Sequence, residues 1–159
     1  MVVTPVTRRW PPRCGVLSGT GSRATRSFWA VLQQVEREAF LTLLAGQAGV
    51  PTDRVVTAGE TVAGDALLVL RQVGRRGGWR AGGDPGGGGA GLARWAWAAL
   101  ARLHDAGIVH GQVDRDHLVV DDGAVGLVDF RRGGVAPSDV QCWADQAQML
   151  VATVLAVGE

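Results

Sequence analysis

Residues 100–131 constrain the fold of this chain more than any other stretch, because signals for a helix, a loop and two strands follow one another closely. The stretch begins with an apolar helical pattern that ends at a glycine. A loop opens with His110-Gly111, and two apolar runs then predict strands over residues 118–120 and 125–128. A turn of two aspartates and a glycine separates the strands, and the second one ends at Asp129-Phe130. The stretch therefore predicts a helix, a polar loop and a β-hairpin, in that order.

The rest of the chain completes an α+β pattern. Apolar residues recur at three- and four-residue spacing over residues 28–48, which predicts an amphipathic helix. Strands are expected over residues 55–58 and 66–73. The second of these is a continuous apolar run, so we expect it to be buried on both faces.

Two further helices are expected in the second half of the chain. In the helix over residues 92–105, Trp95 falls on the apolar stripe and Trp97 on the opposite face. The last helix spans residues 139–157 and begins at Ser138 or Asp139 as its N-cap. Its tail is apolar all round, which predicts a helix buried on every side.

Composition divides the chain into four segments. Residues 1–27 hold several prolines and five arginines but no acidic residue, which predicts a disordered Arg-rich leader. Residues 28–73 carry a helix and strands. Residues 74–91 are rich in Gly and Arg and are expected to form a mobile hinge linker. Residues 92–159 hold the loop and the Asp-Phe pair.

Composition also excludes several functions. The chain has 159 residues, which suits one domain, and a net charge of +1, which gives no electrostatic case for binding nucleic acid. All sixteen basic residues are Arg, and Lys and Asn are absent, so chemistry that needs a Lys amine or an Asn amide is excluded. No apolar run reaches the roughly 18 residues of a membrane-spanning helix. Cys14 and Cys142 lie too far apart for a metal or redox pair.

The His-Gly loop, two short strands and Asp-Phe are similar to the catalytic and metal-binding segment of the protein-kinase-like fold, including the aminoglycoside-phosphotransferase type. Residues 35–45 (VEREAFLTLLA) and 103–108 (LHDAGI) make the resemblance more specific. Together they resemble the kinase-like N-terminal region of actinobacterial membrane proteins that carry a lysylphosphatidylglycerol-synthase-like transmembrane region. The resemblance covers about residues 31–157. It implies a partial kinase-like fold, with a small remnant N-lobe and a truncated helical C-lobe ending at its buried central helix.

The resemblance assigns roles to residues of the central stretch. His110 corresponds to the histidine of the catalytic loop, and Gly111 stands where many small-molecule kinases also have Gly. Gln112 stands where the catalytic base Asp is expected, and His117 where an Asn binds the second metal. Asp129 corresponds to the Asp that holds Mg²⁺, with Phe130 after it.

Three further positions follow from the resemblance. Arg131 replaces the Gly of the D-F-G motif, which restricts backbone freedom and puts a cation beside Asp129. Glu38 corresponds to the helix Glu that pairs with a phosphate-binding Lys, although we expect no strand before residue 28 that could carry such a residue. A solvated or locally paired carboxylate is the alternative for Glu38. Asp145 corresponds to a buried helix Asp that accepts hydrogen bonds from the loop backbone, or is an ordinary first-turn carboxylate.

These residues predict a kinase-like domain without phosphotransfer, because an amide at Gln112 can orient a hydroxyl but cannot accept its proton. General-base help is worth roughly 10²–10⁴-fold. One alternative is a residual phosphotransferase that uses Mg-ATP, with Asp114 or Asp116 as a substitute base. Others are a metal-dependent hydrolase built from His110, Asp114, His117 and Asp129, and a gene remnant that does not fold. The expected location is the cytoplasm, with association with a membrane protein as the partner that the resemblance implies.

Overall fold

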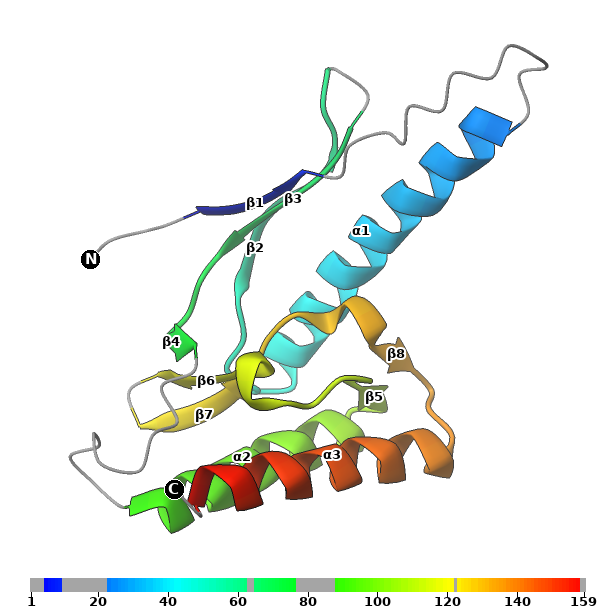
Figure 1. The fold of residues 1–159 in the computed structure, drawn as a ribbon. Helices are drawn as coiled ribbons and strands as arrows, with labels where there is room; N and C mark the ends of the chain where they lie inside the picture. Colours follow the sequence, from blue (N-terminus) through cyan, green and yellow to red (C-terminus); the bar gives the residue numbers. More distant parts are fainter. Residues whose placement is uncertain (1–4, 10–22, 63–64, 77–87, 122, 158–159) are drawn as a thin grey trace.

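The computed structural model describes residues 5–9, 23–62, 65–76, 88–121 and 123–157, which form an α+β protein (Figure 1). The predicted fold class is confirmed at this level. In chain order the elements are β1 (Pro5–Arg9), α1 (Arg23–Gln47), β2 (Arg54–Glu60), β3 (Ala66–Arg71), β4 (Arg75–Arg76), α2 (Gly88–Asp105), β5 (Ile108–Val109), β6 (Leu118–Asp121), β7 (Ala124–Leu127), β8 (Gly134–Val135) and α3 (Asp139–Val157). Two short 3₁₀ turns, η1 (Arg115–His117) and η2 (Phe130–Arg132), flank the hairpin β6–β7.

The first sheet is antiparallel, with strand order β1-β3-β2, and it packs against α1. Alternate residues of β3 (Ala66, Leu68 and Leu70) join one apolar cluster with Leu32 and Val35 of α1. Val69 on the other face of β3 is only half-buried. The prediction that β3 is buried on both faces is therefore wrong for the face that carries Val69. Among the described elements, a helix covers the sheet on the other side only.

The second apolar cluster lies between α2, α3 and the hairpins, where α2 and α3 run side by side (Figure 1). Leu103, Leu127, Phe130 and Met149 are completely buried there. The C-terminal half of α1 contributes Leu41 and Ala45 to the same cluster. The single helix α1 therefore belongs to both apolar clusters.

A close backbone contact fixes the hairpin against the turn after α1. The Leu127 N–H donates to the carbonyl oxygen of Pro51 at 3.0 Å. A Cβ on Gly126 would lie 1.9 Å from that oxygen, so a side chain at this position would collide with backbone. Glycine is therefore required at 126 for β7 to reach Pro51.

Helix ends follow from local chemistry. The Ser138 N–H donates to the side-chain oxygen of Gln141 at 3.0 Å, which is half of a capping box and makes Ser138 the N-cap of α3. Gly107, with φ +70°, closes α2 by donating to His104 at 2.8 Å. The predicted start of the last helix and the end of the helix before it are both confirmed.

The structure differs from the expectations for residues 1–27 and for the linker. A disordered leader was expected over residues 1–27, but Pro5–Arg9 form β1 and Arg23–Ser27 belong to α1. No strand was expected before residue 28, and β1 is such a strand. The strand β1 is stabilised by backbone hydrogen bonds to β3, and a local sequence pattern does not reveal such long-range pairing. Within the expected linker 74–91, β4 pairs with β6 and α2 begins at Gly88. The rest of these two segments lies outside the described residues.

Two apolar surfaces are also more exposed than expected. Trp95 is 43% exposed, because the buried stripe of α2 runs through its smaller neighbours Ala96 and Ala99. The tail of α3, expected to be buried all round, exposes Leu150 and Val154 by more than half. In the part of the chain that the structure describes, no helix is long and apolar enough to cross a bilayer.

Candidate functional site

The carboxylate of Asp145 anchors the loop that opens with His110. It is fully buried in the second turn of α3. One oxygen accepts the His110 backbone N–H at 2.7 Å and the other accepts the Gly111 N–H at 2.8 Å. His104 of α2 contacts the same carboxylate at 3.3 Å. Asp145 therefore makes the backbone contacts expected for it, and the alternative of an exposed first-turn carboxylate is wrong.

Gly111 lets the loop approach η2 closely. Its φ is +77°, in the left-handed region that favours glycine. A Cβ at this position would lie 2.3 Å from the carbonyl oxygen of Arg132. The loop and η2 therefore meet at a point where only glycine fits.

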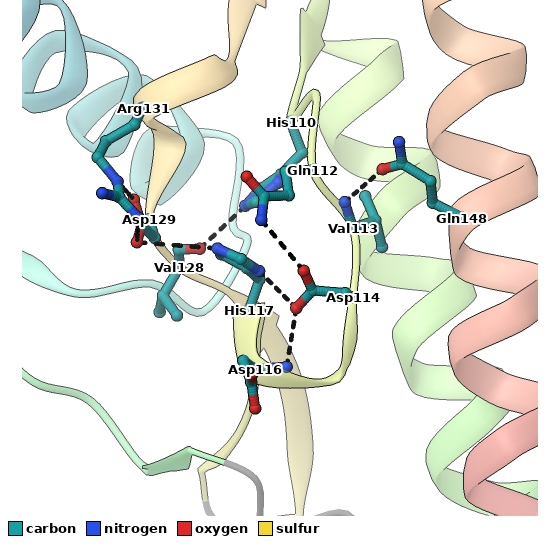
Figure 2. A network of polar contacts seen from close by, with 10 residues as sticks. All are labelled: His110, Gln112, Val113, Asp114, Asp116, His117, Val128, Asp129, Arg131 and Gln148. Carbon is teal, nitrogen blue, oxygen red and sulfur yellow. Dashed lines mark hydrogen bonds and ion pairs between the residues drawn. The ribbon is translucent and has the colours of Figure 1, made fainter.

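The side chain of His110 is structural in this arrangement. It is fully buried, and its Nε2 donates to the carbonyl oxygen of Val128 at 3.0 Å (Figure 2). Its ring also lies 4.8 Å from the ring of Phe130. Burial lowers the pKa of His110, which favours the neutral imidazole. His110 therefore holds the backbone directly before Asp129.

Asp129 is held by an arginine two residues further along the chain. Arg131 Nε contacts one carboxylate oxygen at 2.5 Å, and Nη2 contacts the other at 2.8 Å. This bidentate geometry is the strong form of an arginine–carboxylate pair. It raises the pKa of Arg131. Asp129 itself has φ +71°, so a left-handed turn folds the chain back and brings the two side chains together.

His117 lies between two carboxylates (Figure 2). Its Nδ1 contacts Asp114 at 2.6 Å, and its Nε2 lies 3.8 Å from Asp129. Asp114 also accepts the Asp116 backbone N–H at 2.9 Å, which caps η1. Gln112 donates to the other oxygen of Asp114 at 3.3 Å. These contacts form one polar row, from Gln112 through Asp114, His117 and Asp129 to Arg131.

The hydrogen bonds that Asp114 accepts make its carboxylate a weak proton acceptor. Burial raises the pKa of this carboxyl, but its hydrogen bonds with His117 and Gln112 outweigh burial, so the pKa lies below its usual value. A carboxylate with a lowered pKa binds a proton poorly near neutral pH. Asp116, the other expected substitute, is exposed and enters the row only through its backbone N–H. Neither Asp114 nor Asp116 is therefore suited to act as the substitute base that the resemblance would require.

Glu38 lies on α1 and is buried, so of the two forms of the alternative the solvated carboxylate is wrong, while the locally paired one stays a prediction. Its charge is close enough to raise the pKa of Arg131. Arg37, its neighbour, donates to the carbonyl oxygen of Gly133 at 3.0 Å. The helix α1 therefore holds the segment after Asp129 from the side opposite the loop.

The expected groups of metal ligands do not fit a metal ion here. Among the described residues, no group of three His, Cys, Asp or Glu side chains could hold one. His110 Nε2 binds the Val128 carbonyl, and Arg131 binds both oxygens of Asp129. His117 offers nitrogen, whereas Mg²⁺ prefers oxygen. The four residues of the hydrolase alternative therefore do not form a metal-binding group in this arrangement, and Asp129 is already paired with Arg131.

One residue that sequence reasoning missed completes the site. Gln148 of α3 accepts the Val113 backbone N–H at 2.6 Å, one turn beyond Asp145. Spacing of three residues on one helix places both side chains on the same face, and this signal could have found it. A cation beside Asp129 was expected from Arg131, but the bidentate geometry of the pair was not, since it depends on the left-handed turn at 129.

No protein-family model and no curated protein matches this chain.

Proposed function

We propose that this chain is a protein-kinase-like domain that has lost phosphotransfer and acts as a regulatory or interaction module. The order of its elements supports the fold: a small sheet against α1, then α2, an anchored loop, a hairpin and α3. The hydrogen bonds from the His110-Gly111 backbone to Asp145 support it further. These are the relationships that the resemblance implies.

One observation carries the loss of activity: the guanidinium of Arg131 holds both oxygens of Asp129. A divalent cation would have to displace a bidentate, charge-assisted pair to reach this carboxylate. Gln112 adds a second loss, because its amide already donates to Asp114 and has no basic site for a substrate proton. The site keeps the backbone architecture of the loop but not the reactive groups.

The direct test is isothermal titration of the purified chain with Mg-ATP. We expect no heat of binding up to millimolar nucleotide and no ATP turnover. Magnesium-dependent ATP turnover that disappears in Asp129→Asn would disprove the proposal and favour the residual phosphotransferase.

The role of Arg131 is tested separately with Arg131→Gly. We expect this variant to gain a heat of binding with Mg²⁺ that the parent lacks, because Asp129 loses its resident cation. Arg132→Gly is the matched control, since Arg132 is the exposed neighbouring arginine. Equal titrations of the two variants would show that Arg131 does not block the carboxylate.

A further inference from the structure

The surface of α3 that faces away from α2 carries an uninterrupted set of exposed apolar residues. We call this set the apolar face of α3. At about 100° per residue, its members cover about 140° of the helix circumference. It consists of Val140, Trp143, Ala144, Ala147, Leu150, Val151, Val154 and Leu155.

The size of this face is unusual for a surface helix. Its six large residues are 55–68% exposed. Together they form one contiguous apolar patch, whereas surface apolar residues on a monomer are usually scattered singly. One partner of a standard protein interface contributes about 800 Å². A dimer through this face would bury all six large residues and the surface around them.

The face has both a ridge and a groove. Trp143, Ala147, Leu150 and Val154 follow spacings of four, three and four residues, the seam pattern of paired helices. Beside them, a cavity of about 460 Å³ lies between α3 and the loop before η1. Val113, Val151 and Leu155 give this groove an apolar lining. A symmetric pair needs a ridge and a groove on the same surface of each copy, and both are present here.

Charge distinguishes a second copy from a lipid surface. From Val140 to Val157, the only charged residue of α3 is Asp145, which is buried on the opposite side. The α3 surfaces of two copies therefore meet without like-charge repulsion, and Asp114 and Arg115 in the lining of the groove carry opposite charges. Helices that lie on membranes carry Lys or Arg beside the apolar stripe, and α3 has neither.

We propose that the apolar face of α3 is the contact surface of a symmetric homodimer, in which the ridge of each copy packs into the groove of the other. This interface does not depend on the proposed loss of phosphotransfer.

Sedimentation equilibrium of the full chain tests the dimer. At micromolar concentrations we expect twice the 16.6 kDa mass of one chain. Leu150→Glu is expected to halve that mass, because it places a charge in the middle of the ridge. Val56→Glu is the matched control: Val56 is equally exposed but lies on β2, so the dimer is expected to persist.

Circular dichroism shows whether each variant keeps its helix content. If Leu150→Glu loses helix, Leu150→Gln repeats the test without a charge, and the same halving is expected. A wild-type chain that sediments as a monomer overturns the proposal, and so does a Leu150 variant that is folded and still dimeric. A monomer that floats with phosphatidylcholine vesicles also overturns it and assigns the face to lipid.

Discussion

Asp145 and Gly111 are joined by a 2.8 Å hydrogen bond from the Gly111 backbone N–H to the buried carboxylate, although 34 residues separate them in the sequence. The other oxygen of the same carboxylate accepts the His110 N–H. One side chain of α3 therefore holds two successive backbone groups of the loop, and it fixes the place where His110 bonds the Val128 carbonyl directly before Asp129.

We predict that Asp145→Ala lowers the free energy of unfolding by about 3 kcal/mol, because it leaves two loop N–H groups without their acceptor. Urea unfolding at pH 7 measures the change. Asp139→Asn is the control, since this exposed carboxylate of the first turn contributes only about 0.5 kcal/mol through the helix dipole. Equal losses in the two variants would mean that Asp145 does not anchor the loop.

Gly111→Ala is predicted to cost more than Gly49→Ala, although the two glycines have nearly the same φ, +77° and +76°. At Gly49 nothing lies within 4 Å of an added Cβ, so only the left-handed backbone is penalised, by about 1 kcal/mol. At Gly111 the Arg132 carbonyl must also move, which adds about 2 kcal/mol. Thermal unfolding of both variants gives the difference, and a difference near zero would contradict the close approach.

The buried His110 predicts a loss of stability in mild acid. Burial holds its pKa in the folded chain below the ordinary 6.5, so below pH 6.5 the unfolded chain binds the proton more readily. Stability due to the neutral ring is complete above pH 6.5 and declines as the pH falls, by at most about 1.4 kcal/mol per pH unit. His110→Gln should flatten this slope between pH 6.5 and 5 in urea unfolding. An unchanged slope would show that His110 does not remain neutral.

Asp114 predicts a smaller effect in stronger acid. Its folded-state pKa lies below the ordinary 3.8, so its contribution is present above that pH and is lost as the pH falls through the folded-state value. The side chain is 47% exposed, so solvent limits the effect to at most about 1 kcal/mol. Wild type should be more stable than Asp114→Asn at pH 7, and the two should converge below pH 3.8. A gap that persists at pH 2.5 would point to a cause other than this charge.

Much of the architecture was accessible from local patterns. The helical period and the Ser138 cap place the start of α3, and the turn chemistry places the hairpin β6–β7. The contact of Asp145 with the loop followed from the resemblance rather than from any local signal. What escaped was long-range: β1 is a short Arg-containing segment whose strand conformation depends on pairing with residues about sixty positions later.

In the candidate site, too, residue types could be interpreted from the sequence, whereas geometry that depends on the fold could not. Residue type alone predicts that Gln112 is not a general base, because a side-chain amide has no basic site wherever it lies. The sequence also placed the cation of Arg131 beside Asp129, but the bidentate geometry of this pair depends on a left-handed backbone turn that residue identity does not specify. The exposure of Trp95 depends on which edge of an apolar stripe meets the core, and periodicity places a stripe only to within about one residue.

The membership of α1 in both apolar clusters couples the sheet to the helical half of the molecule. Leu32 and Val35 serve one cluster, and Leu41 and Ala45 serve the other, on one continuous rod. Unfolding of either cluster exposes apolar side chains of α1 to water. Unfolding of one half therefore destabilises the other half. Calorimetry should therefore record one heat-absorption peak, and limited heating should release no separately folded piece.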